Sequence, residues 1–239
     1  MANGKTGGGS GGGKVSDARH KAVRVKSARG RKNSSTRWLQ RQLNDPYVLE
    51  AKRLGYRGRA AFKLKEIDEK YSLLPRRGTV VDLGCAPGGW VQIARERMGE
   101  GYGYVVGIDL LECEPIPGAK LLQADFMDDD APGLIKAELD GPVDVVLSDM
   151  AANTTGHAPT DHIRTQALAE LAYHFAQEIL KPGGAFVSKV FAGGTEKELL
   201  TQLKRDFEKV AHFKPPASRK ESPEMYVVAL GFRGHVDGA

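Results

Sequence analysis

The chain has 239 residues, of which 41% are hydrophobic, and carries a formal net charge of +5. This length suits one domain with a substantial core plus an extra segment. No run approaches the roughly 20 apolar residues of a membrane helix, and the N-terminus lacks a signal-peptide core, so we expect a cytoplasmic protein without membrane contact. The two cysteines, Cys85 and Cys113, favour neither a disulfide framework nor a zinc site, and no metal is expected.

The positive charge is concentrated in a Gly/Ser-rich tail. Residues 1–32 contain nine Lys or Arg and one Asp, a net charge of +8, so the rest of the chain carries −3. Such a segment cannot bury a core, so we expect residues 1–33 to be a disordered tail, 34–235 the folded domain, and 236–239 a short C-terminal tail. The basic tail could add non-specific affinity for a polyanion such as RNA, or it could be solvated without a role.

Helical patterns follow the tail. Apolar spacing and capping residues predict helices at 35–43, 46–54 and 57–71, with Gly55 ending the second. They place many basic side chains close together in sequence: Arg37, Arg41, Lys52, Arg53, Arg57, Arg59, Lys63 and Lys65.

From residue 79 onward, strands alternate with helices. Short apolar runs typical of buried parallel strands stand at 79–83, 104–108, 143–147 and 185–190, and helical stretches at about 90–98, 131–139 and 162–180. This alternation predicts an α/β fold with a parallel sheet covered on both faces. Two further strands, 210–213 and 225–232, are joined by a loop. That hairpin closes the sheet, so one edge strand is expected to be antiparallel.

A glycine-rich turn joins the first of these strands to its helix: Asp82-Leu83-Gly84-Cys85-Ala86-Pro87-Gly88-Gly89-Trp90. Open α/β sheets bind ligands at such turns, and glycine lets the backbone approach a ligand closely. The dinucleotide fingerprint G-x-G-x-x-G fails here because Ala86 occupies its second glycine. A plain strand-to-helix turn would need fewer glycines, so the turn predicts another nucleotide-type ligand.

Two carboxylates follow neighbouring strands. Asp109 ends the second strand, where it can accept both ribose hydroxyls of an adenosine, and Asp125 follows the third, placed to meet the adenine amino group. Each acid alone would more often be a solvated loop residue. Their succession at strand ends, in register with the glycine turn, indicates an adenosine-type site.

Further motifs complete the pattern, namely Ser35-Thr36-Arg37-Trp38-Leu39, Arg59-Ala60-Ala61-Phe62-Lys63-Leu64, Ser148-Asp149-Met150-Ala151, Lys189-Val190-Phe191 and Glu224-Met225-Tyr226. With the glycine turn, they make the chain from about Ser34 to Phe232 resemble the RrmJ/FtsJ family of ribose 2′-O-methyltransferases. The resemblance implies a Rossmann-like, mostly parallel seven-stranded sheet whose seventh strand is antiparallel, and S-adenosylmethionine as methyl donor. It also implies a catalytic tetrad and a donor site. The tetrad falls on Lys63, Asp149, Lys189 and Glu224, and the donor positions fall on Gly88, Trp90, Asp109, Asp125 and Asp149.

The sequence departs from the family pattern at a few positions. Cys85 stands where alanine is usual, Ala152 where proline is common, and Ser188 where valine is usual. None of these removes a functional group that the chemistry needs. The basic tail exceeds the short N-terminal region typical of the family.

The tetrad residues suit methyl transfer. The donor is already activated, so the enzyme must mainly position a hydroxyl and remove its proton. Lys189 ends a parallel strand facing the cleft and is the expected base, while Lys63 supplies a second cation that favours the neutral form of Lys189. We expect Asp149 to orient the lysine and Glu224 to anchor a lysine or the ribose. Without the motif, each lysine would be interpreted as a solvated surface charge.

The resemblance points to ribosomal RNA as partner, specifically a uridine of the large-subunit RNA in the assembled subunit. The basic helices before Lys63, with Lys214, Arg219 and Lys220, could contact phosphates, although a merely solvated face is the alternative. We expect Trp38 and Phe191 to pack in the core and the protein to be a monomer.

Other functions remain open. Transfer RNA or a messenger-RNA cap could be the substrate, although no cap-binding domain is evident. A non-catalytic RNA-binding ribosome-assembly factor would have no need to keep all four tetrad residues. A small-molecule methyltransferase would rarely need the basic helices.

Overall fold

The computed structural model describes residues 43–99, 101, 103–152, 155–192 and 197–234. The expected tails at 1–33 and 236–239, the domain boundary at 34 and nearly all of the expected helix at 35–43, with Arg37, Trp38 and Arg41, lie outside the described residues. The chain divides after Glu50 into two units, and the sheet lies in the second. Within the described ranges, no helix is both long and apolar enough to cross a bilayer.

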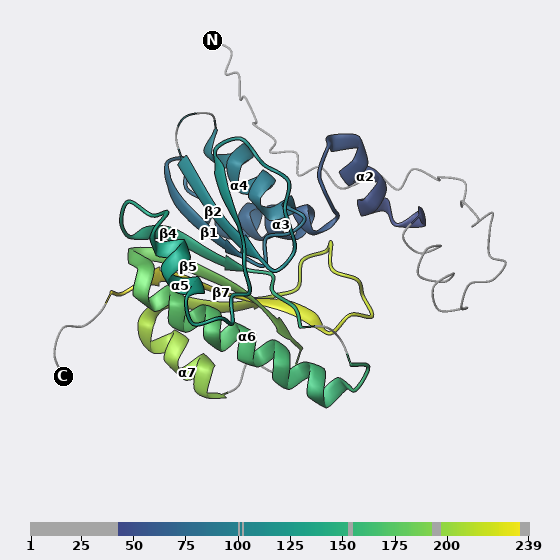
Figure 1. Ribbon diagram of the computed structural model, residues 1–239. Helices are drawn as coiled ribbons and strands as arrows, with labels where there is room; N and C mark the ends of the chain where they lie inside the picture. The colour runs from purple at the N-terminus through teal and green to yellow at the C-terminus, as the bar shows by residue number, and fades with distance from the viewer. Residues whose placement is uncertain (1–42, 100, 102, 153–154, 193–196, 235–239) are drawn as a thin grey trace, which may run out of the picture. The chain divides into compact units, whose positions relative to one another are not determined.

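Helices and strands alternate along most of the described chain (Figure 1). In order they are α2 (Pro46–Leu54), α3 (Ala60–Tyr71), β1 (Gly78–Leu83), α4 (Gly89–Met98), β2 (Gly103–Asp109), β3 (Ala119–Gln123), α5 (Ala131–Lys136), β4 (Val143–Ser148), α6 (Ala158–Ile179), β5 (Leu180–Phe191), α7 (Lys197–Asp206), β6 (Phe207–Phe213) and β7 (Glu224–Phe232). The predicted α/β alternation is confirmed.

The strands of the described residues form one seven-stranded sheet in the order β3-β2-β1-β4-β5-β7-β6. Strands β1 to β5 pair in parallel, whereas β7 runs antiparallel to both β5 and β6. The mostly parallel sheet with a reversed seventh strand is therefore confirmed. The expected antiparallel edge strand is also confirmed, because β6 forms the edge and pairs antiparallel with β7, which lies one place inside the edge.

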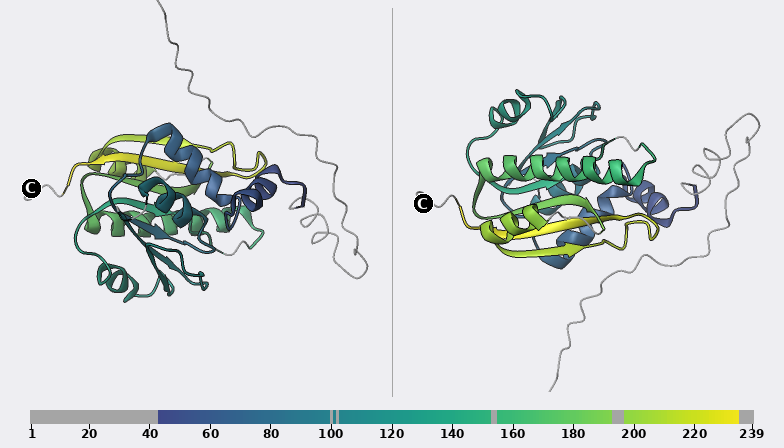
Figure 2. Two further views of the ribbon diagram at one scale, coloured as in Figure 1. Left: turned by 90° about the horizontal axis from the view of Figure 1, so that it is seen from above. Right: turned by 90° about the horizontal axis from the view of Figure 1, so that it is seen from below.

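Two helix layers cover the sheet, as the views from above and below show (Figure 2). Helices α3 and α4 pack on one face, and α5, α6 and α7 pack on the other. The position of β1 between these two helix layers explains why its own sequence is a mainly apolar run. Val80 faces the first layer while Val81 and Leu83 face the second, and all three side chains are fully buried. A strand with helices on both faces is mainly apolar, and in β1 the buried Asp82 is the exception.

Some predicted bounds were wrong. Helix α3 begins at Ala60 rather than 57, because Arg57 is held outside the helix, with its backbone N–H donated to Gln92. Helix α6 begins at Ala158, and α5 stops at Lys136, beyond which residues 137–139 form a looser turn. Helix α7 was not predicted, although its buried Leu199 and Leu203 stand four residues apart on one face.

Candidate active site

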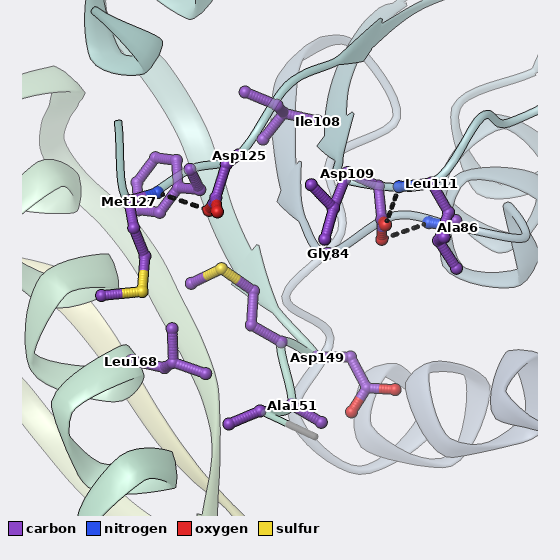
Figure 3. Close-up of a pocket in the computed structure, with 14 residues that line it drawn as sticks. Gly84, Ala86, Ile108, Asp109, Leu111, Asp125, Met127, Asp149, Ala151 and Leu168 are labelled. Atoms are coloured by element: carbon purple, nitrogen blue, oxygen red, sulfur yellow. Dashed lines mark hydrogen bonds between the residues drawn. The ribbon is translucent and has the colours of Figure 1, made fainter. Parts of the chain in front are cut away.

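A cavity of about 470 Å³ opens at the carboxyl ends of β1, β2, β3 and β4 (Figure 3). It is lined by Gly84, Ala86, Ile108, Asp109, Leu110, Leu111, Asp125, Phe126, Met127, Asp149, Met150, Ala151, Ala152 and Leu168. A volume of this size, with a mainly apolar lining and a few polar groups, is typical of sites that bind small molecules. The polar groups here are the three predicted carboxylates Asp109, Asp125 and Asp149.

The wall formed by the glycine turn depends on a close backbone approach at Gly84. This residue has φ +82°, and a Cβ there would lie 2.9 Å from Cγ and 3.0 Å from Cα of Met150. A larger residue at this position would therefore be strained and would push the turn after β1 away from the segment after β4. Gly84 thus brings the two segments together at the edge of the cavity.

Two of the cavity carboxylates, Asp109 and Asp125, are oriented by backbone amides (Figure 3). Asp109 accepts from the N–H of Ala86 at 2.9 Å and from the N–H of Leu111 at 2.8 Å, so it joins the glycine turn to the end of β2. Asp125 accepts from the N–H of Met127 at 2.9 Å. Each oxygen involved retains a second lone pair, so both side chains can still accept hydrogen bonds from a ligand.

The other two predicted donor positions, Gly88 and Trp90, are not among the residues that line the cavity. Gly88, at φ +109°, precedes α4, and a Cβ there would lie 2.8 Å from Ile116 and 2.9 Å from the Arg57 guanidinium. Trp90 is almost fully buried, donates its indole N–H to the carbonyl of Ala60 at 2.8 Å, and packs on the ring of Tyr226. Their contact with a donor stays a prediction.

The four tetrad residues converge from four different elements. Lys63 lies on α3, Asp149 follows β4, Lys189 lies near the end of β5, and Glu224 begins β7. The Lys63 Nζ lies 2.6 Å from Glu224 Oε1 and 3.9 Å from Asp149 Oδ2. The Lys189 Nζ lies 2.9 Å from Asp149 Oδ1 and donates to the Asp149 carbonyl at 2.7 Å. Asp149 therefore links the two lysines and also lines the cavity.

Burial makes these ion pairs more than surface contacts. The four side chains are only 9–17% exposed. Burial alone would raise the pKa of Asp149, but the charges of Lys189 and Lys63, with hydrogen bonds from Lys189 and Tyr226, hold its pKa below the ordinary value. Asp149 is therefore an ionised carboxylate between two cationic side chains, and it can orient a lysine at neutral pH.

Tyr226 is a member of this cluster to which the sequence interpretation gave no role. Its hydroxyl donates to Asp149 Oδ1 at 2.7 Å and lies 3.1 Å from Glu224 Oε1. The side chain is fully buried, and burial together with the charges of Asp149 and Glu224 raises the pKa of the phenol well above its usual value. The signal was present, because residues two apart on a strand face the same side, and Tyr226 stands two residues after Glu224.

Asp82 lies in the buried part of β1 near the same carboxylates. It is 1% exposed, and within the described residues neither carboxyl oxygen has a hydrogen-bond partner. Burial, followed by the charges of Asp149 and Asp109, raises the pKa of Asp82 well above its usual value. Burial at this position therefore favours the neutral form of the Asp82 carboxyl group over the charged form.

Several basic residues expected to face phosphates bind backbone carbonyls instead. The Arg57 guanidinium donates to the carbonyls of Pro87, Glu114 and Pro115, and Arg59 donates to that of Ala217. The Lys214 ammonium donates to the carbonyls of Lys220 and Ser222, at 3.0 and 2.7 Å. Phosphate contact by these residues stays a prediction, but in this structure their donors hold loops in place.

The cysteines and metal-binding groups add no further centre in the part of the chain described. Cys85 and Cys113 are both free thiols. No three His, Cys, Asp or Glu side chains among the described residues are grouped so that they could hold a metal ion.

Comparison with known proteins identifies the family. Residues 56–232 match the family of FtsJ-like methyltransferases. A protein of Paramagnetospirillum magneticum is 61% identical over 94% of this chain and 93% of its own length, and one of Parvibaculum lavamentivorans is 59% identical over 97% and 95%; both are named ribosomal RNA large subunit methyltransferase E.

A solved structure agrees with this match. A Plasmodium falciparum protein described as a ribosomal RNA methyltransferase shares 32% identity with this chain and superposes with a TM-score of 0.67, over 75% of this chain and all of that one. The motifs, the sheet order and these matches lead to one conclusion: the chain belongs to the FtsJ-like methyltransferase family.

Proposed function

We propose that this protein transfers a methyl group from S-adenosylmethionine to a ribose 2′-hydroxyl, that of a uridine in the RNA of the assembled large ribosomal subunit. One observation carries the proposal: two lysines and two carboxylates form a buried cluster through Asp149, which also lines the nucleoside-sized cavity. The names of the relatives support ribosomal RNA as the substrate.

The cavity suits S-adenosylmethionine. Asp109 and Asp125 offer acceptor oxygens at the ends of adjacent strands, where ribose hydroxyls and an adenine amino group would meet them. Ile108, Phe126 and Leu168 supply apolar surface for the rest of the nucleoside. When bound, the donor supplies a methyl group already activated by its sulfonium charge. Asp149 lies at the boundary between the cavity and the lysines. Its ionised carboxylate would balance the sulfonium charge of the donor.

The cluster is suited to removing a proton from a weakly acidic hydroxyl. We assign Lys189 as the group that takes the 2′-hydroxyl proton, because it lies next to Asp149 and is 9% exposed, in a partly dry site. Asp149 fixes the Lys189 ammonium by two contacts, one to its carboxylate and one to its carbonyl. Lys63, held by Glu224, is a second lysine that shares the Asp149 carboxylate with Lys189.

The test is methyl transfer from labelled S-adenosylmethionine to large subunits isolated from cells that lack this protein. Transfer RNA, capped messenger RNA and naked ribosomal RNA serve as parallel substrates. The proposal predicts label at one uridine of the subunit RNA that resists alkaline cleavage, because that cleavage needs a free 2′-hydroxyl.

Two other outcomes would overturn the proposed function. Label confined to transfer RNA or to a cap would retain the chemistry but replace the substrate. Absence of both transfer and donor binding, with RNA binding intact, would instead indicate a non-catalytic assembly factor.

A further inference from the structure

The loop between β6 and β7 is anchored to the helix that carries Lys63. This loop, residues 214–223, is the yellow segment that extends past the strand ends in Figure 1. The backbone N–H of Ala217 donates to Glu66 Oε2 at 2.7 Å, and its carbonyl accepts from Arg59. Ala217 is fully buried, and both of its backbone polar groups pair with side chains. Glu66 belongs to α3, and Arg59 is the residue just before that helix.

These two anchoring residues flank Lys63 on one face of the helix. Arg59 stands four residues before Lys63 and Glu66 three residues after it, and residues three or four apart lie next to one another on a helix surface. The helix face that presents the lysine to Glu224 therefore also holds the loop that leads into Glu224. The position of Lys63 and the position of the loop that leads into Glu224 are therefore coupled through α3.

The anchored loop reaches Glu224 through the next residue, Ser218. Its hydroxyl donates to Glu224 Oε1 at 3.3 Å, and the residue is only 6% exposed. The same oxygen lies 2.6 Å from Lys63 Nζ and 3.1 Å from the Tyr226 hydroxyl. Lys63 and Ser218 both donate to this carboxylate oxygen, and of the two only the position of Ser218 depends on the loop.

We propose that Glu66 and Ser218 are positioning residues that hold the Glu224 carboxylate, and through it Lys63, in the arrangement that methyl transfer requires. The proposal rests on the proposed function. Glu66 acts through Ala217 and Ser218, since it is neither a member of the tetrad cluster nor a residue that lines the cavity. The loop is also closed on itself, because Lys214 donates to two of its carbonyls and the Ser218 N–H donates to the Pro215 carbonyl at 2.8 Å.

The test compares Glu66→Ala with Glu66→Gln, which keeps an acceptor oxygen for the Ala217 N–H, and with Glu69→Ala, which removes an exposed acid from the same helix. Full-length protein is assayed for kcat and KM on large subunits at saturating S-adenosylmethionine, together with donor affinity. We expect Glu66→Ala to lower kcat about tenfold, with KM and donor affinity unchanged, because it removes a charge-assisted hydrogen bond. Glu66→Gln should restore most of the rate, and Glu69→Ala should match wild type.

A double-mutant cycle separates positioning from general destabilisation. If Glu66 and Ser218 act through Glu224, adding Glu66→Ala or Ser218→Ala to Glu224→Gln should cause little further loss of kcat. Additive losses would overturn the proposal, as would a rise in KM at unchanged kcat, which would indicate a direct RNA contact.

Hydrogen exchange decides the loop's anchoring without any substrate. Glu66→Ala should speed amide exchange in residues 214–224, whereas Glu66→Gln and Glu69→Ala should not. Unchanged exchange in Glu66→Ala would overturn the proposal even if turnover fell. Failure of the wild-type protein to methylate subunits would instead contradict the proposed function, and the exchange experiment would still give its own result.

Discussion

The cavity and the lysine–carboxylate cluster are neighbouring parts of one site, but they are built differently. The cavity is made by short segments at strand ends, and its carboxylates Asp109 and Asp125 are oriented by nearby backbone amides. The cluster joins Lys63 and Lys189, whose elements are far apart in the chain, through side-chain ion pairs. The cavity depends on local backbone geometry, and the cluster depends on the register of distant elements.

Donor binding and proton removal should therefore respond separately to substitution, except at Asp149, which belongs to both regions. Asp149→Asn removes the negative charge between the two lysines and a carboxylate from the cavity wall. We expect the largest effect here: about a thousandfold or greater loss of kcat/KM, because the cavity loses a carboxylate and Lys189 loses the group that orients it, and a correctly positioned acid–base group contributes about 10² to 10⁴. Steady-state kinetics with donor titration would show both defects, and a variant impaired in only one would contradict the shared role.

Asp109→Ala should affect the cavity alone. It removes a carboxylate that can accept charge-assisted hydrogen bonds from the donor and that fixes Ala86 and Leu111. We expect S-adenosylmethionine to bind about ten to a hundred times more weakly, measured by calorimetry, while kcat at saturating donor changes less. A loss of kcat with intact donor affinity would show that Asp109 serves the cluster and not the cavity.

Tyr226→Phe should affect the cluster alone and more mildly. The ring still packs on Trp90, but the hydroxyl that contacts Asp149 and Glu224 is lost. We expect kcat to fall about tenfold with donor affinity unchanged, because one hydrogen bond to a charged group is removed. An unchanged rate at saturating donor and subunits would show that the phenol is only a packing residue.

The last prediction concerns stability rather than rate and comes from Asp82. Its folded-state pKa is raised, so the folded protein holds a proton that the unfolded chain releases above about pH 4. Stability is therefore lost as pH rises from that point toward the folded pKa, by about 1.4 kcal/mol per pH unit. Asp82→Asn removes this dependence, so its melting temperature relative to wild type should rise between pH 5 and pH 7. A constant difference across that range would contradict a raised pKa for Asp82.

The same contrast explains what the sequence could predict. Strand-helix alternation and the glycine turn are local patterns, so the α/β fold and the cavity position followed from them. The place of β7 between β5 and β6 did not, because strand pairing depends on contacts that periodicity does not encode. Helix α7 was missed because its apolar pattern is only ten residues long and leads directly into a strand.

The roles of single side chains also divide into those that a local motif indicates and those that depend on contacts between distant segments. The motifs named Lys63, Asp149, Lys189 and Glu224, and the structure brings these four together. Phosphate contact by Arg59 stays a prediction, and in this structure its guanidinium donates to a carbonyl 158 residues away in the sequence. No local pattern indicates so distant an acceptor, and the same holds for the Glu66 contact with the β6–β7 loop.

The most direct test of the central claim is the single-turnover rate of Lys189→Ala with S-adenosylmethionine and large subunits both saturating. We expect a loss of about a hundredfold or more in the rate of methyl transfer, with donor affinity equal to wild type, because the proton acceptor is removed and the cavity is left intact. A rate close to that of wild type would contradict the assignment of Lys189 and, with it, the division of the site into a cavity that binds the donor and a cluster that moves the proton.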